Sequence, residues 1–178
     1  MTPHPAAAAP AAVHALVARA ELDAQRSAVR FAYRLTGDVA RLALPARAAA
    51  RRADRLWEHT CFEAFVAVDG DRYYELNFSP SAEWAAFAFD GYRRGMRPLP
   101  LDAPPSIRVD ETASELLVTA DVELRALGGA GWPRRMGLAA VVEERSGARA
   151  YFALLHPREA PDFHDAAGFV LSLDGSAR

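Results

Sequence analysis

The chain has 178 residues, of which 51% are hydrophobic and 25% charged, an ordinary balance for a single domain with its own core. Its formal net charge of −2 gives no basic surplus for binding nucleic acid or an anionic membrane surface. The single cysteine, Cys61, excludes an intramolecular disulfide, and no apolar run is long enough for a transmembrane helix. Because no basic stretch precedes the apolar N-terminal residues, we expect no secretion signal and a cytoplasmic location.

Residues 1–12 are rich in proline and alanine, and we expect them to be flexible. Residues 13–178 form the expected domain, in which short stretches alternate apolar and polar side chains, as half-buried strands do. In the first half we expect strands at Val13–Leu22, Arg26–Leu35, Val39–Leu44, Thr60–Val68, Arg72–Phe78 and Glu83–Phe89. In the second half we expect them at Ile107–Asp110, Glu115–Leu124, Arg135–Glu143, Ala148–Leu155 and Gly168–Leu173.

These short stretches are separated by Gly, Pro and Asp turns, and no stretch indicates a long helix. Alanines in Val13–Leu22 would also suit a helix, but the alternating pattern that follows favours a strand. The spacing predicts an all-β, single-domain antiparallel β-sandwich of the immunoglobulin-like or jelly-roll-like kind, with a closed barrel as the alternative.

The sequence of one hairpin predicts which residues of its two strands lie opposite each other. Asp69-Gly70-Asp71 is a turn sequence between two alternating strands, and we expect Val68 to lie opposite Arg72. With that register one face is apolar, whereas a slip of one residue would mix polar and apolar side chains on both faces. The other face then carries Glu63 beside Asn77, with Glu75 about one pair away, roughly 5–8 Å.

Two carboxylates on one sheet face suggest several kinds of chemistry. They could accept hydrogen bonds from sugar hydroxyls, bind Ca²⁺, or act as the acid–base pair of a glycoside hydrolase. The plainer interpretation is a solvated sheet face, because antiparallel sheets often have one wet side. The hairpin alone supplies no nucleophile–base geometry, so ligand contact is favoured over catalysis.

The tryptophans Trp57, Trp84 and Trp132 are candidate stacking platforms for a sugar ring. Core packing is the commoner role of a tryptophan. We expect Trp84 on the side of its strand away from Phe87 and Phe89, which would place it outside the core. Trp132 lies in a glycine-rich loop, Leu127–Pro133, and could equally plug one end of the sandwich.

The histidines give weaker indications. His156 and His164 share one loop with Asp162 and Asp165, but their spacing matches no compact zinc motif. His156 and the methionines Met96 and Met136 are possible axial haem ligands, although no CxxCH motif for covalent haem is present. Cys61, inside a predicted strand, is expected to be a buried thiol.

Three segments carry a resemblance to a known family: WEHTCFEAF at 57–65, YYELNFSPSAEWAAFAFDGYRRGM at 73–96 and YFALLHPREAPDFHDAAGF at 151–169. They resemble bacterial DOMON-like proteins, which are similar to the family-nine carbohydrate-binding modules. The resemblance runs from about residue 13 to 173 and implies a β-sandwich with a non-catalytic, ligand-binding role. In the wider group the ligands are sugars or haem. The positions it implies for a binding face are Trp57, Glu63, Glu75, Asn77 and Trp84.

We therefore expect a binding module for a carbohydrate or sugar-like small molecule, in which Trp57 and Trp84 stack on the ligand. Glu63, Glu75 and Asn77 would make its hydrogen bonds, and His156 completes the ligand-binding set. The alternatives are a haem-binding domain, a glycan-processing enzyme that uses Glu63 and Glu75, and a protein-interaction module. Ca²⁺ and haem stay open as cofactors. We expect no nucleic-acid or membrane partner, and the sequence leaves homo-oligomer formation open.

Overall fold

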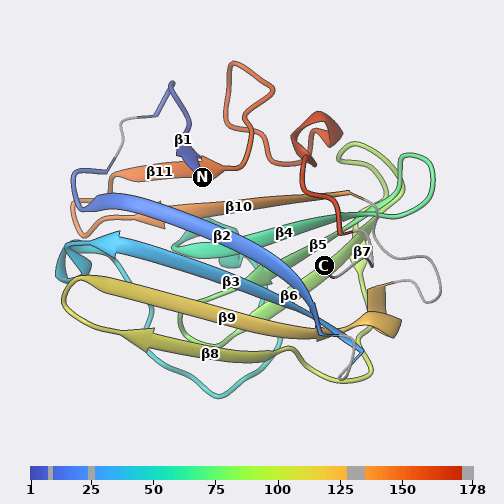
Figure 1. Ribbon diagram of the computed structural model, residues 1–178, viewed down its shortest axis with the longest axis horizontal. Helices are drawn as coiled ribbons and strands as arrows, with labels where there is room; N and C mark the ends of the chain where they lie inside the picture. Colours follow the sequence, from blue (N-terminus) through green and yellow to red (C-terminus); the bar gives the residue numbers. More distant parts are fainter. Residues whose placement is uncertain (8–9, 24–26, 128–134, 174–178) are drawn as a thin grey trace.

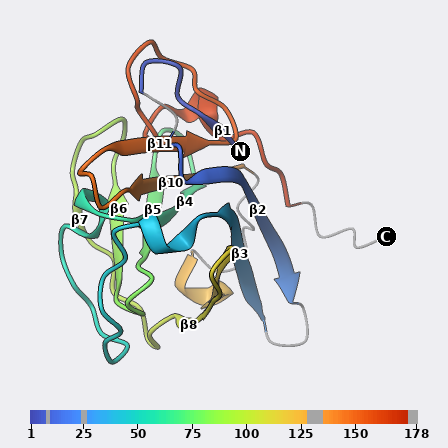
Figure 2. The same cartoon turned by 90° about the vertical axis from the view of Figure 1, so that its left-hand side faces the viewer.

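The computed structural model describes residues 1–7, 10–23, 27–127 and 135–173, whose strands form two antiparallel sheets (Figure 1). In order across it, the large sheet contains β1 (Thr2–Pro3), β11 (Arg149–Ala153), β10 (Met136–Glu143), β4 (Cys61–Ala67), β5 (Tyr73–Phe78), β6 (Trp84–Phe89) and β7 (Arg97–Pro98). The small sheet contains β2 (Val13–Asp23), β3 (Ala28–Gly37), β9 (Glu115–Glu123) and β8 (Ser106–Glu111). Figure 2 shows the two sheets as separate layers, so the predicted β-sandwich is confirmed.

Alternate residues of the strands fill the space between the sheets. In β3, the predicted inward set of Val29, Phe31 and Tyr33 is fully buried. Partners from the large sheet are Phe62, Leu76 and Phe78, also without exposed surface. This alternation between an apolar and a polar side is what the period of two in the sequence predicts for a strand.

The hairpin register is also confirmed. The Val68 amide donates to the Arg72 carbonyl at 2.9 Å, and Glu63 pairs with Asn77 along β4 and β5. Tyr33 of the small sheet supports this hairpin from within the core, because its hydroxyl donates to the backbone carbonyl of Glu63 at 2.8 Å. This hydrogen bond between the two sheets therefore fixes the backbone of β4 at Glu63, the first of the two predicted carboxylates.

Two predicted strands are wrong. Residues 39–44 contain a 3₁₀ turn, Val39–Arg41, followed by a single bridge from Leu42 to Glu144. Residues 168–173 likewise make only one bridge, between Leu171 and Met136. Both stretches are apolar but short, and their buried side chains fill gaps beside the sheets without extending a ladder of hydrogen bonds.

The Pro/Ala-rich start of the chain, which we expected to be flexible, makes defined contacts. Thr2–Pro3 pairs with Phe152 and Ala153 of β11, and His4 is buried. Pairing with an open sheet edge uses backbone groups and needs no alternating side chains, so composition does not reveal it.

The helical segments among the described residues are short 3₁₀ turns, namely Val39–Arg41, Leu56–Glu58, Leu124–Leu127 and Ala166–Gly168. None of these has the length and apolar character that a bilayer-spanning helix requires.

Candidate functional site

The candidate site lies on the outer face of the large sheet, which is the face turned away from the small sheet. Alternate residues of three neighbouring strands supply it: Glu63 and Phe65 from β4, Tyr73, Glu75 and Asn77 from β5, and Phe87 and Phe89 from β6. The register brings the two glutamates together diagonally, because Glu63 pairs with Asn77 and Phe65 pairs with Glu75. The polar residues that the sequence predicted on one face thus do share it.

The expectation that this face is solvated is wrong. Glu63, Glu75 and Asn77 are only 3%, 4% and 0% exposed. Two segments cover them: the 3₁₀ turn Leu56–Glu58 and a covering segment after β11, residues 154–169. Aromatic side chains of these segments pack on the strands, which makes the outer face a second buried layer.

Gly137 of β10 permits the close approach of the covering segment. A Cβ atom at this position would lie 2.8 Å from a ring carbon of Phe169, which is nearer than side chains pack. Phe169 also stacks on Phe65, with ring centroids 5.9 Å apart. A glycine at this point therefore lets the covering segment lie flat against the sheet.

A cavity of about 330 Å³ remains between the outer face and its cover. Its lining combines charged, polar and apolar side chains, namely Trp57, Glu63, Glu75, Phe89, Arg93, Met96, Val141, Tyr151, Pro161, Phe163 and His164. This size lies at the small end of the range of about 300–1,000 Å³ for small-molecule sites. The mixture of apolar walls with a few polar groups is typical of such sites.

The two carboxyl groups differ in their hydrogen bonds. The Asn77 side-chain amide donates to Glu75 Oε1 at 2.8 Å. In contrast, Glu63 Oε1 is buried and has no hydrogen-bond partner within the described part of the chain. Buried polar atoms are nearly always satisfied, and an exception inside a cavity marks a place where a ligand group or water can bind.

Burial raises the pKa of both carboxyl groups, because the charged form loses its hydration. The negative charge of Glu75 raises the pKa of Glu63 further. The Asn77 hydrogen bond and the nearby Arg93 charge act in the opposite direction on the pKa of Glu75. Glu75 is therefore the group that ionises first, and Glu63 retains its proton to higher pH.

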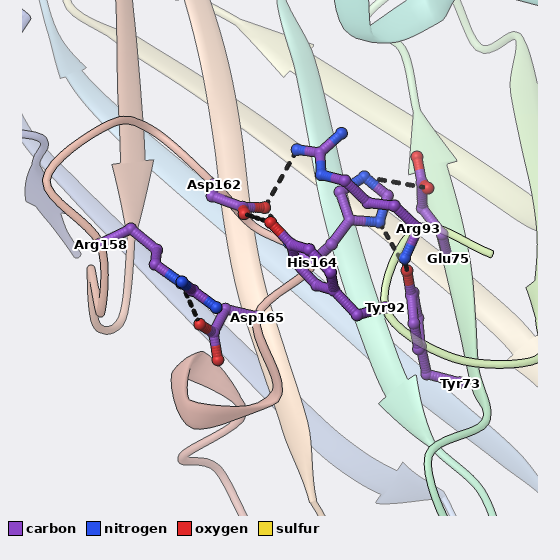
Figure 3. Close-up of polar contacts among 8 residues, drawn as sticks. All are labelled: Tyr73, Glu75, Tyr92, Arg93, Arg158, Asp162, His164 and Asp165. Atoms are coloured by element: carbon purple, nitrogen blue, oxygen red, sulfur yellow. Dashed lines mark hydrogen bonds and ion pairs between the residues drawn. The ribbon is translucent and has the colours of Figure 1, made fainter.

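His164 stands beside this pair, between Glu75 and Tyr73 (Figure 3). Its Nδ1 atom is 2.7 Å from the Tyr73 hydroxyl, and its Nε2 atom is 3.9 Å from Glu75 Oε2. The Tyr73 hydroxyl accepts a hydrogen bond from the Arg93 backbone amide at 3.2 Å, so its own proton is free to point to Nδ1. A neutral His164 then carries its proton on Nε2, facing Glu75.

The surroundings keep His164 neutral. Burial and then the nearby Arg93 charge lower the pKa of His164 to about 4. Burial likewise raises the pKa of Tyr73 to about 12. The histidine can thus donate one hydrogen bond into the cavity without bringing a positive charge.

Asp162 joins the two loops that border the cavity. It accepts from the Arg93 guanidinium at 3.0 Å, from the His164 backbone amide at 3.0 Å, and from the Tyr92 hydroxyl (Figure 3). These bonds, together with its ion pair to Arg93, hold the pKa of Asp162 below its usual value although burial opposes them. Asp162 therefore fixes the loop after β6 to the covering segment.

Of the three tryptophans predicted as stacking platforms, the described residues place one, Trp57, at the cavity. Trp57 lines it from the 3₁₀ turn and contacts Phe87 edge-on, with ring centroids 5.7 Å apart. Trp84 is 8% exposed and belongs to the core between the sheets, because it pairs with the inward-facing Phe78. The expectation that Trp84 shares the carboxylate face is therefore wrong. Trp132 lies outside the described residues.

His156 is also separated from the cavity. Its Nε2 atom is 2.9 Å from the Thr2 carbonyl, and its ring lies 4.7 Å from the ring of His4. Of the two methionines considered with it, Met96 lines the cavity and Met136 is buried in the core. His156 and Met96 thus do not face one site, and this axial pair does not fit a haem. Among the described residues, no three or more His, Cys, Asp or Glu side chains are grouped so that they could hold a metal ion.

Sequence reasoning missed several residues of the site. Tyr73 alternates with Glu75, so the hairpin register already placed it on the same face. His164 and Asp162 were considered only as metal ligands, and Arg93 was not singled out. These three lie in loops, where neither periodicity nor turn chemistry predicts which strand a side chain will meet.

Comparisons with known proteins bear on the fold. No protein-family model matches the chain, and a search of curated proteins finds no significant match. Among solved structures, the chain is similar to a protein of Bacteroides uniformis that is proposed to bind carbohydrate. The two share 15% sequence identity with a TM-score of 0.62, over 86% of this chain and 75% of that protein. At this identity the similarity establishes a common β-sandwich fold.

Proposed function

We propose that the protein is a non-catalytic binding module whose outer-face cavity takes a carbohydrate or sugar-like small molecule. The observation that carries this proposal is the meeting of Trp57, Glu63 and Glu75 around one cavity of about 330 Å³. A sugar presents hydroxyl groups on its edge and C–H groups on its faces, and such a cavity offers partners for both.

The polar groups suit a ring of hydroxyls. Glu75 accepts hydrogen bonds, while the Arg93 guanidinium and the His164 ring donate them. The unpartnered Oε1 atom of Glu63 offers a further hydrogen-bonding position. Trp57 and Phe89 supply apolar walls for the C–H groups. The fold shared with a protein proposed to bind carbohydrate supports the same ligand class.

The test is a thermal-shift screen of the full chain against monosaccharides and short oligosaccharides. A ligand present at about 100 times its Kd stabilises a protein by about 2.7 kcal/mol. For a chain of this size, that corresponds to a Tm increase of roughly 5–10 °C. We expect such a shift for the wild type and its loss in Trp57→Ala.

Val17→Ala is the control, because Val17 is exposed on β2 of the small sheet, far from the cavity. It should keep the full ligand-induced shift. If no sugar raises Tm, or if Trp57→Ala keeps the shift, the proposal is wrong.

A glycan-processing enzyme is the second candidate, because two buried carboxyl groups of raised pKa line one cavity. Binding is favoured over hydrolysis because Glu63 and Glu75 project from adjacent strands of one wall, whereas hydrolases place the pair on either side of the scissile bond. Nitrophenyl glycosides provide the assay. Turnover by the wild type that Glu75→Gln abolishes would favour the enzyme.

A further inference from the structure

When both glutamates are ionised, the charges around the cavity do not balance. Arg93, which lines the cavity, is already paired with Asp162 at 3.0 Å, and this pair is neutral as a whole. His164 approaches Glu75 only to 3.9 Å, and its environment favours the neutral imidazole. The charge of Arg93 acts on Glu75, but no arginine among the described residues forms an ion pair with Glu63 or Glu75.

An ionised carboxyl group that is buried without a cationic partner loses its hydration without a compensating charge, so a bound cation would favour the ionised form of both glutamates. Glu63 is more than nine-tenths buried, its Oε1 atom has no partner among the described residues, and the residue lines the same cavity as Glu75. A cation placed between these two side chains would supply the missing charge and donate hydrogen bonds to both. Such bonds to a charged group are the stronger kind of hydrogen bond.

The walls favour an organic cation over a metal ion. Ca²⁺ takes six to eight oxygen ligands, and among the described residues no three or more His, Cys, Asp or Glu side chains are placed to hold a metal ion together. The cavity instead has aromatic rings from Trp57, Phe89 and Phe163. Aromatic faces attract ammonium groups through their quadrupoles and pack on the attached carbon atoms.

We propose that the ligand of this cavity carries an ammonium group held by Glu63 and Glu75, so that the sugar class it takes is an amino sugar with a free amine. The sugar part of this inference rests on the proposed function above. The ammonium part rests on the charge balance and is tested separately.

Calorimetric titration at pH 7 and low salt compares matched ligands. D-Glucosamine carries an ammonium group in place of the 2-hydroxyl group of D-glucose. N-Acetyl-D-glucosamine keeps the nitrogen atom at this position but has no charge there. Cyclohexylamine and cyclohexanol make the same comparison without a sugar, and CaCl₂ tests the metal ion. We expect glucosamine to bind about tenfold or more tightly than either neutral sugar, since a hydrogen bond to a charged group is worth at least that factor.

The outcomes separate the two proposals. Equal or tighter binding of the neutral sugars would overturn the ammonium inference and leave the proposed function intact. Binding of cyclohexylamine but of no sugar would overturn the proposed function and support the ammonium group. No binding by any of these ligands would overturn both. Tight Ca²⁺ binding that Glu75→Gln abolishes would overturn the inference in favour of a metal site.

Substitutions then locate the effect. Glu63→Gln and Glu75→Gln keep the size of each side chain, and each should reduce the preference for glucosamine over glucose by about tenfold. Glu111→Gln, exposed on β8 of the small sheet, is the matched control and should keep the full preference. Thermal melting confirms that each variant folds. If both cavity variants fold and keep the preference, the carboxylates do not hold the amine and the inference is wrong.

Discussion

The two faces of the large sheet are built from the same strands but are covered differently. The inner face meets the small sheet, whose regular alternation supplies a matching row of apolar side chains such as Phe31 and Leu35. The outer face meets a 3₁₀ turn and the covering segment, residues 154–169, which have no such repeat. Regular strands close the core, whereas irregular loops leave a cavity with polar side chains in it.

The comparison suggests a division of roles between neighbouring residues. Along β4 and β5, one residue in two packs between the sheets and the next lies on the outer face. Leu76 belongs to the core, whereas its neighbours Glu75 and Asn77 lie on the outer face, where Glu75 lines the cavity. Substitutions one position apart should therefore affect different properties, either stability or binding.

The largest expected effect is on the inner face. Phe78 has no exposed surface and its ring lies 5.6 Å from that of Phe31. Phe78→Ala should lower the free energy of unfolding by about 3–5 kcal/mol, because it removes buried contacts and leaves a cavity. Urea denaturation measures the loss.

Phe89→Ala on the outer face is the matched comparison. Phe89 stacks on Tyr73 at 4.7 Å but also borders the cavity, so it has fewer contacts to lose. We expect a smaller loss of stability together with weaker ligand binding. A loss as large as that of Phe78→Ala would contradict the difference between the two faces.

An intermediate effect concerns the pH dependence of stability. The pKa of His164 is lowered from 6.5 to about 4 in the folded protein. As pH falls, His164 is therefore protonated in the unfolded chain at a higher pH than in the folded protein. The stability that His164 contributes is present above pH 6.5 and is lost between pH 6.5 and 4, by about 3 kcal/mol. Glu63 and Glu75 act oppositely, because their raised pKa values make the folded state bind protons first.

Comparison of the wild type with His164→Gln isolates the histidine contribution. Urea unfolding at several pH values should give a wild-type stability that falls, relative to the variant, on acidification from pH 6.5 to 4. A constant difference over this range would show that His164 titrates normally and is not held neutral in the fold.

The smallest effect has the opposite sign. Replacing Glu63 by methionine removes a buried carboxyl group with an unpartnered oxygen and keeps a side chain of similar length. Glu63→Met should raise the free energy of unfolding by about 1–3 kcal/mol, the approximate cost of leaving a buried polar atom unsatisfied. It should also abolish ligand binding. A destabilised Glu63→Met variant would mean that the carboxyl group serves the fold.

The sequence predicted the parts of this comparison that depend on regular alternation. The register of β4 and β5 follows from the turn Asp69-Gly70-Asp71 and the separation of polarity, and it brought Glu63, Glu75 and Asn77 to one face. Trp84 was misplaced because Phe87 and Phe89 were taken to mark the core. Both faces of β6 are apolar, so its pattern does not distinguish inside from outside.

The cover of the outer face could not be predicted in the same way. His164 and Arg93 reach the cavity from loops, and the bonds that hold them, to Tyr73 and Asp162, join positions 91 and 69 residues apart along the chain. Such pairings depend on the path of irregular backbone, which no local pattern in the sequence determines. The sequence predicted that Glu63 and Glu75 share one face of the sheet, but it did not predict that loops bury them.

The central claim is that the ligand binds at the outer face, and the most direct measurement follows the tryptophan indole N–H signals by NMR during titration with a stabilising sugar. Trp57→Phe and Trp84→Phe variants assign the two relevant signals. We expect the Trp57 signal to shift with ligand concentration while the Trp84 signal, from the core between the sheets, stays in place. Saturable binding that leaves the Trp57 signal unchanged would contradict the account.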